Sequence, residues 1–201
     1  MTLLSYELDE VKNGSTLIAG VDEVGRGPLA GPVVCACVIM PLDDLIDGVD
    51  DSKKLSEKKR EGFNKLIKEK ALAYSICEID ERRIDEINIL NATKECMTNA
   101  VNSLKIKPEV LLVDALKLDG VDNSIKQISI IKGDATSYNI ACASIIAKVY
   151  RDNLMVELDK KYPEYEFTKN KGYGTKNHIE AIKKYGARDI HRRSFIKNFV
   201  E

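Results

Sequence analysis

Long apolar runs are absent from this sequence. No stretch approaches the roughly 18 consecutive apolar residues that a bilayer-spanning helix needs. The first residues also lack the basic segment, apolar stretch and cleavage site of a secretory signal peptide. We therefore expect no membrane partner, and a cytoplasmic location is the default prediction.

Linkers, internal repeats and low-complexity segments are absent as well. With 201 residues, of which 44% are hydrophobic, the chain is long enough to bury a sizeable core. We predict one main domain over 17–160. An N-terminal arm or helix over 1–16 is expected before it, and a small helical C-terminal appendage over 161–201 after it.

Metal-binding cysteine patterns are also lacking. The five cysteines are odd in number and scattered, and no two of them form a Cys-x-x-Cys pair. The only two histidines, His178 and His191, lie far from them in the sequence. This pattern argues against a zinc site and favours buried free thiols in a reducing compartment. We expect His191 to be a packing residue.

A strong net charge is missing too. The formal net charge is −1, which does not by itself indicate a nucleic-acid partner. Lysine and arginine nevertheless dominate the segments 53–70 and 169–197. These segments either form a local basic surface or are the solvated faces of surface helices, and composition leaves both alternatives open.

Hydrophobic patterning predicts strands and helices that interleave along the chain. The expected strands are 17–24, 33–40, 72–79, 110–113 and 127–131. The expected helices are 56–70, a short one capped by Asp80 with a longer one after it, and 137–160. This order predicts an α/β fold with a mixed five-stranded sheet flanked by helices.

Four carboxylates stand at the ends of predicted strands: Asp22 and Glu23 at the end of the first, Asp114 after the fourth and Asp134 after the fifth. Each acid alone is most simply a cap or turn residue. Functional groups gather at strand ends in α/β sheets, however, and acids converging there without a matching base predict a site for Mg²⁺ or Mn²⁺. Two such ions about 4 Å apart would support phosphodiester hydrolysis.

The two adjacent acids raise a geometric difficulty. Successive side chains of a regular strand point to opposite faces, so Asp22 and Glu23 should not both face one site. We therefore expect irregular backbone at Glu23.

The glycine-rich segment after the first strand has two interpretations. Gly25, Gly27 and Ala30 fit the pattern G-x-G-x-x-A of a dinucleotide-binding turn. Pro28 and Pro32 oppose a helix there, and the residues that follow predict a strand instead. The glycines are better explained by close approach of bare backbone to a ligand.

A set of ordered motifs resembles the type 2 ribonuclease H family, also called ribonuclease HII. The motifs are VDEVGRG at 21–27, DSKKLS at 51–56, NILNAT at 88–93, VDA at 113–115, KGD at 132–134, ASIIAKVYRD at 143–152, KGYGT at 171–175 and HRRSF at 191–195. The resemblance covers about residues 17–196. It implies a ribonuclease-H-like fold and two-metal cleavage of RNA joined to, or paired with, DNA, including single ribonucleotides embedded in DNA.

The resemblance also implies roles for individual residues. Asp22, Glu23, Asp114 and Asp134 would bind the catalytic Mn²⁺ or Mg²⁺ ions. The substrate-binding residues would be Gly25, Arg26 and Gly27 at the ribose 2′-hydroxyl and phosphate, Lys53 or Lys54 at a phosphate, and Tyr173 stacked on a deoxyribose.

Other residues keep open alternatives. Arg192 and Arg193 either touch the nucleic-acid backbone or are solvated surface residues. Ser137, Ser144 and Lys148 lie near the last acid in sequence and are further candidates. Alanine after Asp114, where some relatives have glycine, should be harmless.

An enzyme is favoured over two other classes of protein. A non-catalytic binder of hybrid duplexes would use the basic tail, but it would have no need of four converging acids, which repel phosphate without metal. A nucleotide-binding oxidoreductase is opposed by the prolines of the glycine loop. The expected partners are RNA–DNA hybrid and DNA containing ribonucleotides, and the enzyme is expected to be a monomer.

Overall fold

A five-stranded sheet in the order β3-β2-β1-β4-β5 is the centre of the computed structural model, which describes residues 3–50 and 52–200. The strands are β1 (Ile18–Val24), β2 (Val33–Ile39), β3 (Ala73–Ile79), β4 (Val110–Asp114) and β5 (Lys126–Ile130). β1, β2 and β3 pair antiparallel, whereas β4 and β5 continue the sheet in parallel. The predicted mixed sheet is confirmed.

Seven α-helices surround this sheet within the described residues. They are α1 (Ser5–Lys12), α2 (Glu57–Lys70), α3 (Glu81–Asn102), α4 (Tyr138–Lys161), α5 (Phe167–Asn170), α6 (Lys176–Tyr185) and α7 (Arg193–Val200). Side-chain caps fix several starts: the hydroxyls of Ser56, Ser137 and Thr175 and the carboxylate of Asp80 each accept an N–H from the first turn of their helices.

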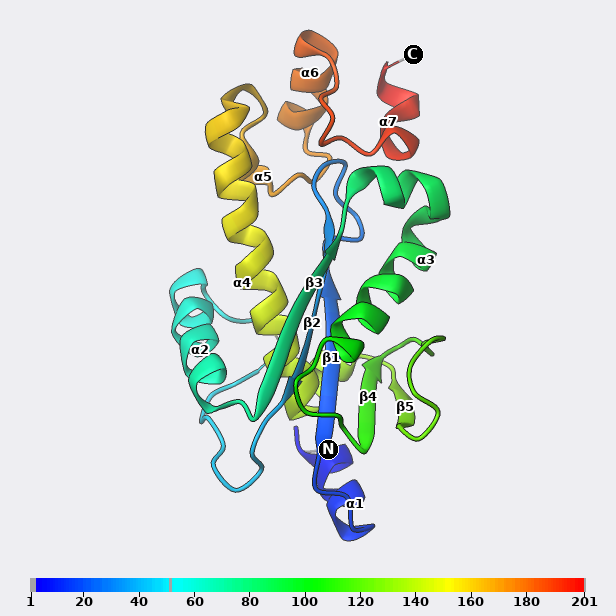
Figure 1. The fold of residues 1–201 in the computed structure, drawn as a ribbon. Helices are drawn as coiled ribbons and strands as arrows, with labels where there is room; N and C mark the ends of the chain where they lie inside the picture. The colour runs from blue at the N-terminus through cyan, green and yellow to red at the C-terminus, as the bar shows by residue number, and fades with distance from the viewer. Residues whose placement is uncertain (1–2, 51, 201) are drawn as a thin grey trace.

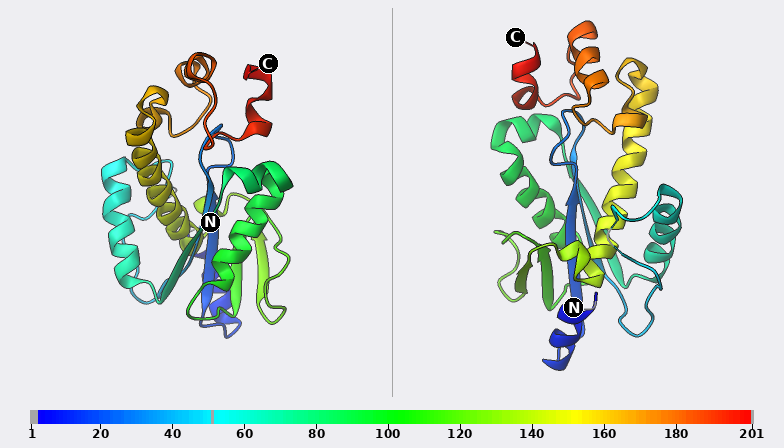
Figure 2. Two further views of the ribbon diagram at one scale, coloured as in Figure 1. Left: turned by 45° about the horizontal axis from the view of Figure 1, so that its top comes forward. Right: turned by 180° about the vertical axis from the view of Figure 1, so that it is seen from behind.

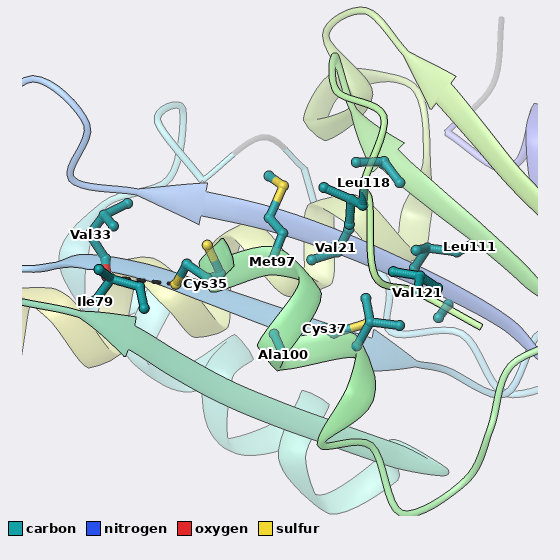
Figure 3. Packing of buried hydrophobic residues seen from close by; sticks show 14 of the residues in the cluster. Val21, Val33, Cys35, Cys37, Ile79, Met97, Ala100, Leu111, Leu118 and Val121 are labelled. Atoms are coloured by element: carbon teal, nitrogen blue, oxygen red, sulfur yellow. Dashed lines mark hydrogen bonds between the residues drawn. The ribbon is translucent and has the colours of Figure 1, made fainter. Parts of the chain in front are cut away.

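The sheet is covered on both faces, as Figures 1 and 2 show. Helix α3 packs on one face, where β2 contributes Cys35 and Cys37 and the helix contributes Met97 and Ala100 (Figure 3). Helices α2 and α4 pack on the other face against the alternate residues of β2. All seven residues of β2 are therefore buried, which explains its continuous apolar sequence.

Helix α3 is two helices joined at a kink. Asn88 has φ 67° and ψ 163°, which interrupts the helical backbone. Its side-chain oxygen accepts the N–H groups of Leu90 and Asn91, so it caps the second half. The predicted short helix followed by a longer one is confirmed.

Two contacts fix the start of helix α4. A Cβ added to Gly20 of β1 would lie 2.3 Å from the backbone of Asn139, so the helix rests directly on the strand. On the other side, buried Glu7 of α1 accepts the hydroxyl of Ser137 and the backbone N–H of Asn139. The N-terminal helix thus packs on the main domain, and the predicted division into 1–16, 17–160 and 161–201 stays a prediction.

The C-terminal helices form a small layer at the end of the sheet opposite α1 (Figure 1). Its core contains Tyr165, Phe167 and Ile182 packed beneath Met155 of α4. None of the described helices is both long and apolar enough to cross a bilayer.

Candidate active site

Three of the four predicted acids meet at one edge of the sheet. Asp22, Glu23 and Asp114 each place one carboxylate oxygen within 4.8 Å of the corresponding oxygens of the other two. Asp22 and Glu23 directly precede Val24, the last residue of β1, and Asp114 ends the neighbouring strand β4. The parallel arrangement of β1 and β4 brings both strand ends to the same edge.

The expected irregular backbone at Glu23 is wrong. β1 pairs with β2 in unbroken register through Asp22, Glu23 and Val24. The pairing of β1 with β4 stops at Val21, so beyond it one side of β1 is open. The side chains of Asp22 and Glu23 start from opposite faces of a regular strand, and their carboxylates can come together at this open side.

Burial without a cation raises the pKa of all three acids. The pKa of Asp22 lies well above its usual value because the side chain is desolvated and because Glu23 and Asp114 are close. Burial also raises the pKa of Glu23, and the guanidinium of Arg26 partly offsets that effect. Burial is again the main cause for Asp114, while the N–H of Gly133 lowers its pKa.

The fourth acid lies beside this cluster and is held by a lysine. Asp134 is buried in a 3₁₀ turn (Gly133–Ala135), and its Oδ2 accepts a hydrogen bond from Nζ of Lys53 at 2.9 Å. Its negative charge also raises the pKa of Asp114, so the two carboxylates are near each other. Asp134 does not belong to the compact group of three oxygen ligands found among the described residues.

The donor set fits a hard divalent cation. Oε2 of Glu23 is buried and has no hydrogen-bond partner in the described part of the chain. Three carboxylates with an unsatisfied oxygen offer the oxygen ligands that Mg²⁺ and Mn²⁺ prefer. They open onto a cleft of about 290 Å³. Its lining also includes Ser52, Lys53, Ser144, Lys148 and Tyr173.

The glycine loop borders the same site. Arg26 lies next to the acids, with its Nη1 3.3 Å from Oε1 of Glu23. Gly25 has φ +91°, and an added Cβ would lie 2.3 Å from Nε of Arg151. Gly27 lacks both constraints, because its nearest neighbour would be the ring of Tyr173 at 3.5 Å. The fold therefore needs glycine at position 25 but not at position 27.

Tyr173 lies beside Gly27 and lines the same cleft as the acids. It is 43% exposed. Its carbonyl oxygen lies 2.9 Å from Nδ1 of His178, whose Nε2 lies 3.2 Å from Nε2 of His191. Both histidines are buried, so the predicted packing role of His191 agrees with its position.

Sequence comparison complements this geometry. The family model described as Ribonuclease HII matches residues 19–198. This chain belongs to the ribonuclease HII family. The family consists of ribonucleases that act on RNA–DNA hybrids and depend on a divalent metal, and the chain is accordingly a ribonuclease H enzyme.

Individual relatives agree with the family assignment. The ribonuclease HII of Ruminiclostridium cellulolyticum is 57% identical over 199 residues, which cover 99% of this chain and 77% of that protein. The crystal structure of ribonuclease H2 from Pyrococcus horikoshii OT3 has a TM-score of 0.77 and 32% identity, and the match covers 92% of this chain and 97% of that one. Bst-RNase HIII in complex with Mn²⁺ shares the fold, with a TM-score of 0.69 and 20% identity over 90% of this chain and 67% of that one.

The basic residues proposed for this ribonuclease HII occupy different environments. Lys53 lines the cleft, and Lys54 lies 3.1 Å from Asp50. Arg193 is exposed at the start of α7. The expected nucleic-acid contact of Arg192 is wrong, because this side chain is 0% exposed and its guanidinium is bonded to backbone carbonyls of the glycine loop.

Alanine after Asp114, expected to be harmless, carries a small backbone cost. Ala115 has φ +54°, a left-handed conformation that disfavours residues with a Cβ. Glycine at this position would avoid that cost.

Ser52 and Arg151 escaped prediction from the sequence, whereas Ser144 and Lys148 were among the further candidates. The hydroxyls of Ser52 and Ser144 lie 2.8 Å apart in the cleft, and a hydrogen bond from Ser144 lowers the pKa of Asp22. Lys148 lines the cleft and pairs with Asp152 at 2.7 Å. Arg151 is fully buried, and the local sequence gave no signal for its burial, because charged Lys148 and Asp152 lie close to it in the same helix.

Proposed function

We propose that this ribonuclease HII hydrolyses the RNA strand of RNA–DNA hybrids and also cuts on the 5′ side of ribonucleotides embedded in duplex DNA. The products would carry 5′-phosphate and 3′-hydroxyl ends. Cleavage would depend on two divalent ions, Mn²⁺ or Mg²⁺, and would involve no covalent intermediate with the protein.

The observation that carries this proposal is the meeting of two kinds of group in one cleft. The compact cluster of Asp22, Glu23 and Asp114 supplies hard oxygen ligands. The glycine loop and Tyr173 adjoin the same space. A site with only the acids would indicate a metal centre, and a site with only the loop would indicate a ligand-binding turn.

Each acid has a place in this scheme. Asp22, Glu23 and Asp114 would hold the metal, and Asp134 beside them would contribute to a second position. When bound, the ions supply Lewis acidity and lower the pKa of water. Ser144 keeps Asp22 oriented through its hydrogen bond.

The substrate residues would be those of the glycine loop, which adjoins the acids through Arg26, and Tyr173, which lines the cleft. Gly25, Arg26 and Gly27 would contact the ribose 2′-hydroxyl, the group that distinguishes RNA from DNA, and the adjacent phosphate. Tyr173 would stack on the deoxyribose beyond the scissile phosphate.

Three basic side chains would contact the nucleic-acid backbone. Lys53 is better placed than Lys54 to reach a phosphate near the metal, because it lines the cleft. Lys54 and Arg193 would contact the backbone farther from the acids. Neutralising phosphates with such cations makes binding depend on salt concentration.

The test is cleavage of a DNA duplex that carries one ribonucleotide. Wild-type protein is compared with Asp22→Asn and with Asp119→Asn, in Mn²⁺ or Mg²⁺ and in chelator; Asp119 is an exposed acid that pairs with Lys94 and does not line the cleft. We expect a nick 5′ of the ribonucleotide with the wild type and with Asp119→Asn. Chelator or Asp22→Asn should abolish it.

Other outcomes would separate the parts of the proposal. Cleavage of long RNA–DNA hybrids alone would contradict the junction role given to Tyr173 and leave the metal site intact. Cleavage that persists in chelator would refute the metal dependence. We also propose that the enzyme is a cytoplasmic monomer, in keeping with five cysteines that are all free.

A further inference from the structure

Two arginines are buried beneath the glycine loop without a carboxylate partner. Arg151 of α4 and Arg192, just before α7, are both 0% exposed. No ion pair joins either of them to an acid among the described residues. Burial, with the neighbouring charge of Arg151, lowers the pKa of Arg192 to about 9. Buried cations of this kind require another source of compensation.

Backbone carbonyls provide that compensation. Arg192 donates to the carbonyl oxygens of Arg26 at 2.8 Å, Gly25 at 2.6 Å and Gly31 at 2.7 Å. Arg151 donates to the carbonyl oxygens of Ala30 at 3.1 Å, Pro32 at 3.0 Å and Lys171 at 2.9 Å. The pair therefore clamps six carbonyls, five in the glycine loop and one beside Tyr173.

This clamp determines where the amides of the loop point. In a trans peptide the C=O of one residue and the N–H of the next point in opposite directions, and no described peptide bond is cis. Because the carbonyls of Gly25 and Arg26 point inward to Arg192, the N–H groups of Arg26 and Gly27 point outward. Tyr173, which lines the cleft, lies on that outer side next to Gly27.

These two amides are available for a ligand. In the described part of the chain, neither the N–H of Arg26 nor that of Gly27 donates to an acceptor. The next residue, Pro28, has no N–H, and the N–H of Leu29 is bonded to the carbonyl of Gly172. The loop thus presents two adjacent free donors. Apart from its chain neighbours, a Cβ at Gly27 would meet no described residue closer than 3.5 Å, so this side is open to an approaching group.

We infer that Arg151 and Arg192 are positioning residues for recognition of the ribose. They fix the amides of Arg26 and Gly27 so that both donate to the 2′-oxygen of the ribonucleotide. This inference rests on the proposed function, because it explains how the glycine loop distinguishes RNA from DNA. Neither arginine touches the substrate.

The test measures recognition separately from cleavage. Asp22→Asn protein in Mg²⁺ is titrated with a duplex containing one ribonucleotide and with the identical all-DNA duplex. The ratio of the two dissociation constants reports the contribution of the 2′-hydroxyl. The same ratio is measured after adding Arg192→Lys, Arg151→Lys or the control Arg83→Lys, an exposed arginine paired with Glu95. Thermal melts define a temperature at which every variant is folded.

We expect the ratio to fall by about tenfold in Arg192→Lys and Arg151→Lys, because lysine cannot bridge several carbonyls and hydrogen bonds to the 2′-oxygen are lost. Arg83→Lys should leave it unchanged. A merely structural role would weaken binding of both duplexes together and leave the ratio as it was, which would overturn the inference. A parent protein that binds both duplexes equally would instead refute the proposed 2′-hydroxyl recognition itself.

A second measurement covers variants that fail to fold. In ¹⁵N-labelled Asp22→Asn protein, the amide resonances of Arg26 and Gly27 should shift with the ribonucleotide duplex and stay in place with the all-DNA duplex. Resonances that respond equally to both duplexes would overturn the inference.

Discussion

The acids at the sheet edge and the arginines beneath the glycine loop are both buried charge, but only the acids line the cleft, whereas the arginines lie behind the loop. The arginines are satisfied: the guanidinium groups of Arg151 and Arg192 are bonded to backbone carbonyls on every side. The acids are not, because the pKa values of Asp22 and Glu23 are raised by burial and one oxygen of Glu23 has no partner.

This difference separates two tasks. A group whose hydrogen bonds are complete within the chain is rigid before any ligand arrives, so the glycine loop is preorganised. A cluster of acids that repel one another is complete only with a cation. The glycine loop is therefore held rigid by the folded chain, whereas the acids serve metal-dependent chemistry. Substitutions of the acids should lower activity without lowering stability, and substitutions that disturb the support of the loop should lower stability.

The largest expected effect is on the acidic side. Asp22→Asn should lower the cleavage rate at least about 10³-fold, since a bound metal supplies several kcal/mol of transition-state stabilisation. Without metal the same change should keep or raise the melting temperature, because it removes a charge that is desolvated and repelled. Steady-state cleavage and thermal melts in chelator check both parts. A strongly destabilised variant would contradict the comparison.

The two glycines of the loop provide the matched test on the other side. Gly25→Ala should lower the free energy of unfolding by about 3 kcal/mol, because φ is +91° there and the methyl group would collide with Arg151. Gly27→Ala should change stability by less than about 0.5 kcal/mol and still reduce kcat/KM at least about tenfold. Urea unfolding and cleavage kinetics measure the two effects. Equal stability losses would show that Gly27 is also structural.

The sequence predicted features that depend on local residue patterns. Strand and helix positions follow from periodicity, and acids after apolar strands indicate a site because buried charge is costly. The failures concern long-range contacts. Arg192 is adjacent to exposed Arg193 in the chain, yet only tertiary structure shows that it lies under the glycine loop. The open side of β1 likewise depends on where β4 stops, which no local pattern of β1 records.

Stabilisation of the protein by a bound metal should depend on the acids and not on the glycine loop. At a concentration of about 100 times the dissociation constant, Mn²⁺ should add about 2.7 kcal/mol of stability, which raises the melting temperature of a chain of this size by roughly 5–10 °C. Asp114→Asn should reduce this shift and Gly27→Ala should preserve it. The comparison fails if both variants respond to Mn²⁺ in the same way.

The histidine pair predicts a pH dependence on the preorganised side. Burial, followed by the neighbouring His178, lowers the pKa of His191 to about 4 from its usual 6.5. As the pH falls, His191 is protonated in the unfolded chain before it is protonated in the folded one. The stability that neutral His191 contributes is therefore fully present above pH 6.5 and is lost as the pH falls toward 4. The loss attributable to His191 should be about 2 kcal/mol between pH 8 and pH 5.

Urea unfolding of wild type and His191→Gln at the two pH values measures this contribution. The difference between the two proteins matters, because protonation of the buried acids changes stability in the opposite direction. A wild type that loses no more stability than His191→Gln on acidification would contradict the prediction.

The smallest expected effect is at Ala115. Ala115→Gly should raise the free energy of unfolding by about 0.5 kcal/mol, because relief of a left-handed alanine slightly exceeds the added entropy of an unfolded glycine. Activity should be unchanged. Thermal melts at several scan rates can resolve such a difference, and a lower melting temperature would show that the strain at this position is negligible.

The bare backbone at Gly20 also governs how the molecule can move. Helix α4 sits on β1 there without an intervening side chain, so the two cannot slide past each other without separating. Asp22 follows Gly20 by two residues on β1, and Ser144 and Arg151 lie on α4. The strand and the helix therefore form one rigid unit that holds an acid of the cleft and an arginine beneath the glycine loop. We therefore expect adjustment to an incoming duplex to come from side-chain rotation and from the loops, and not from hinge bending between β1 and α4.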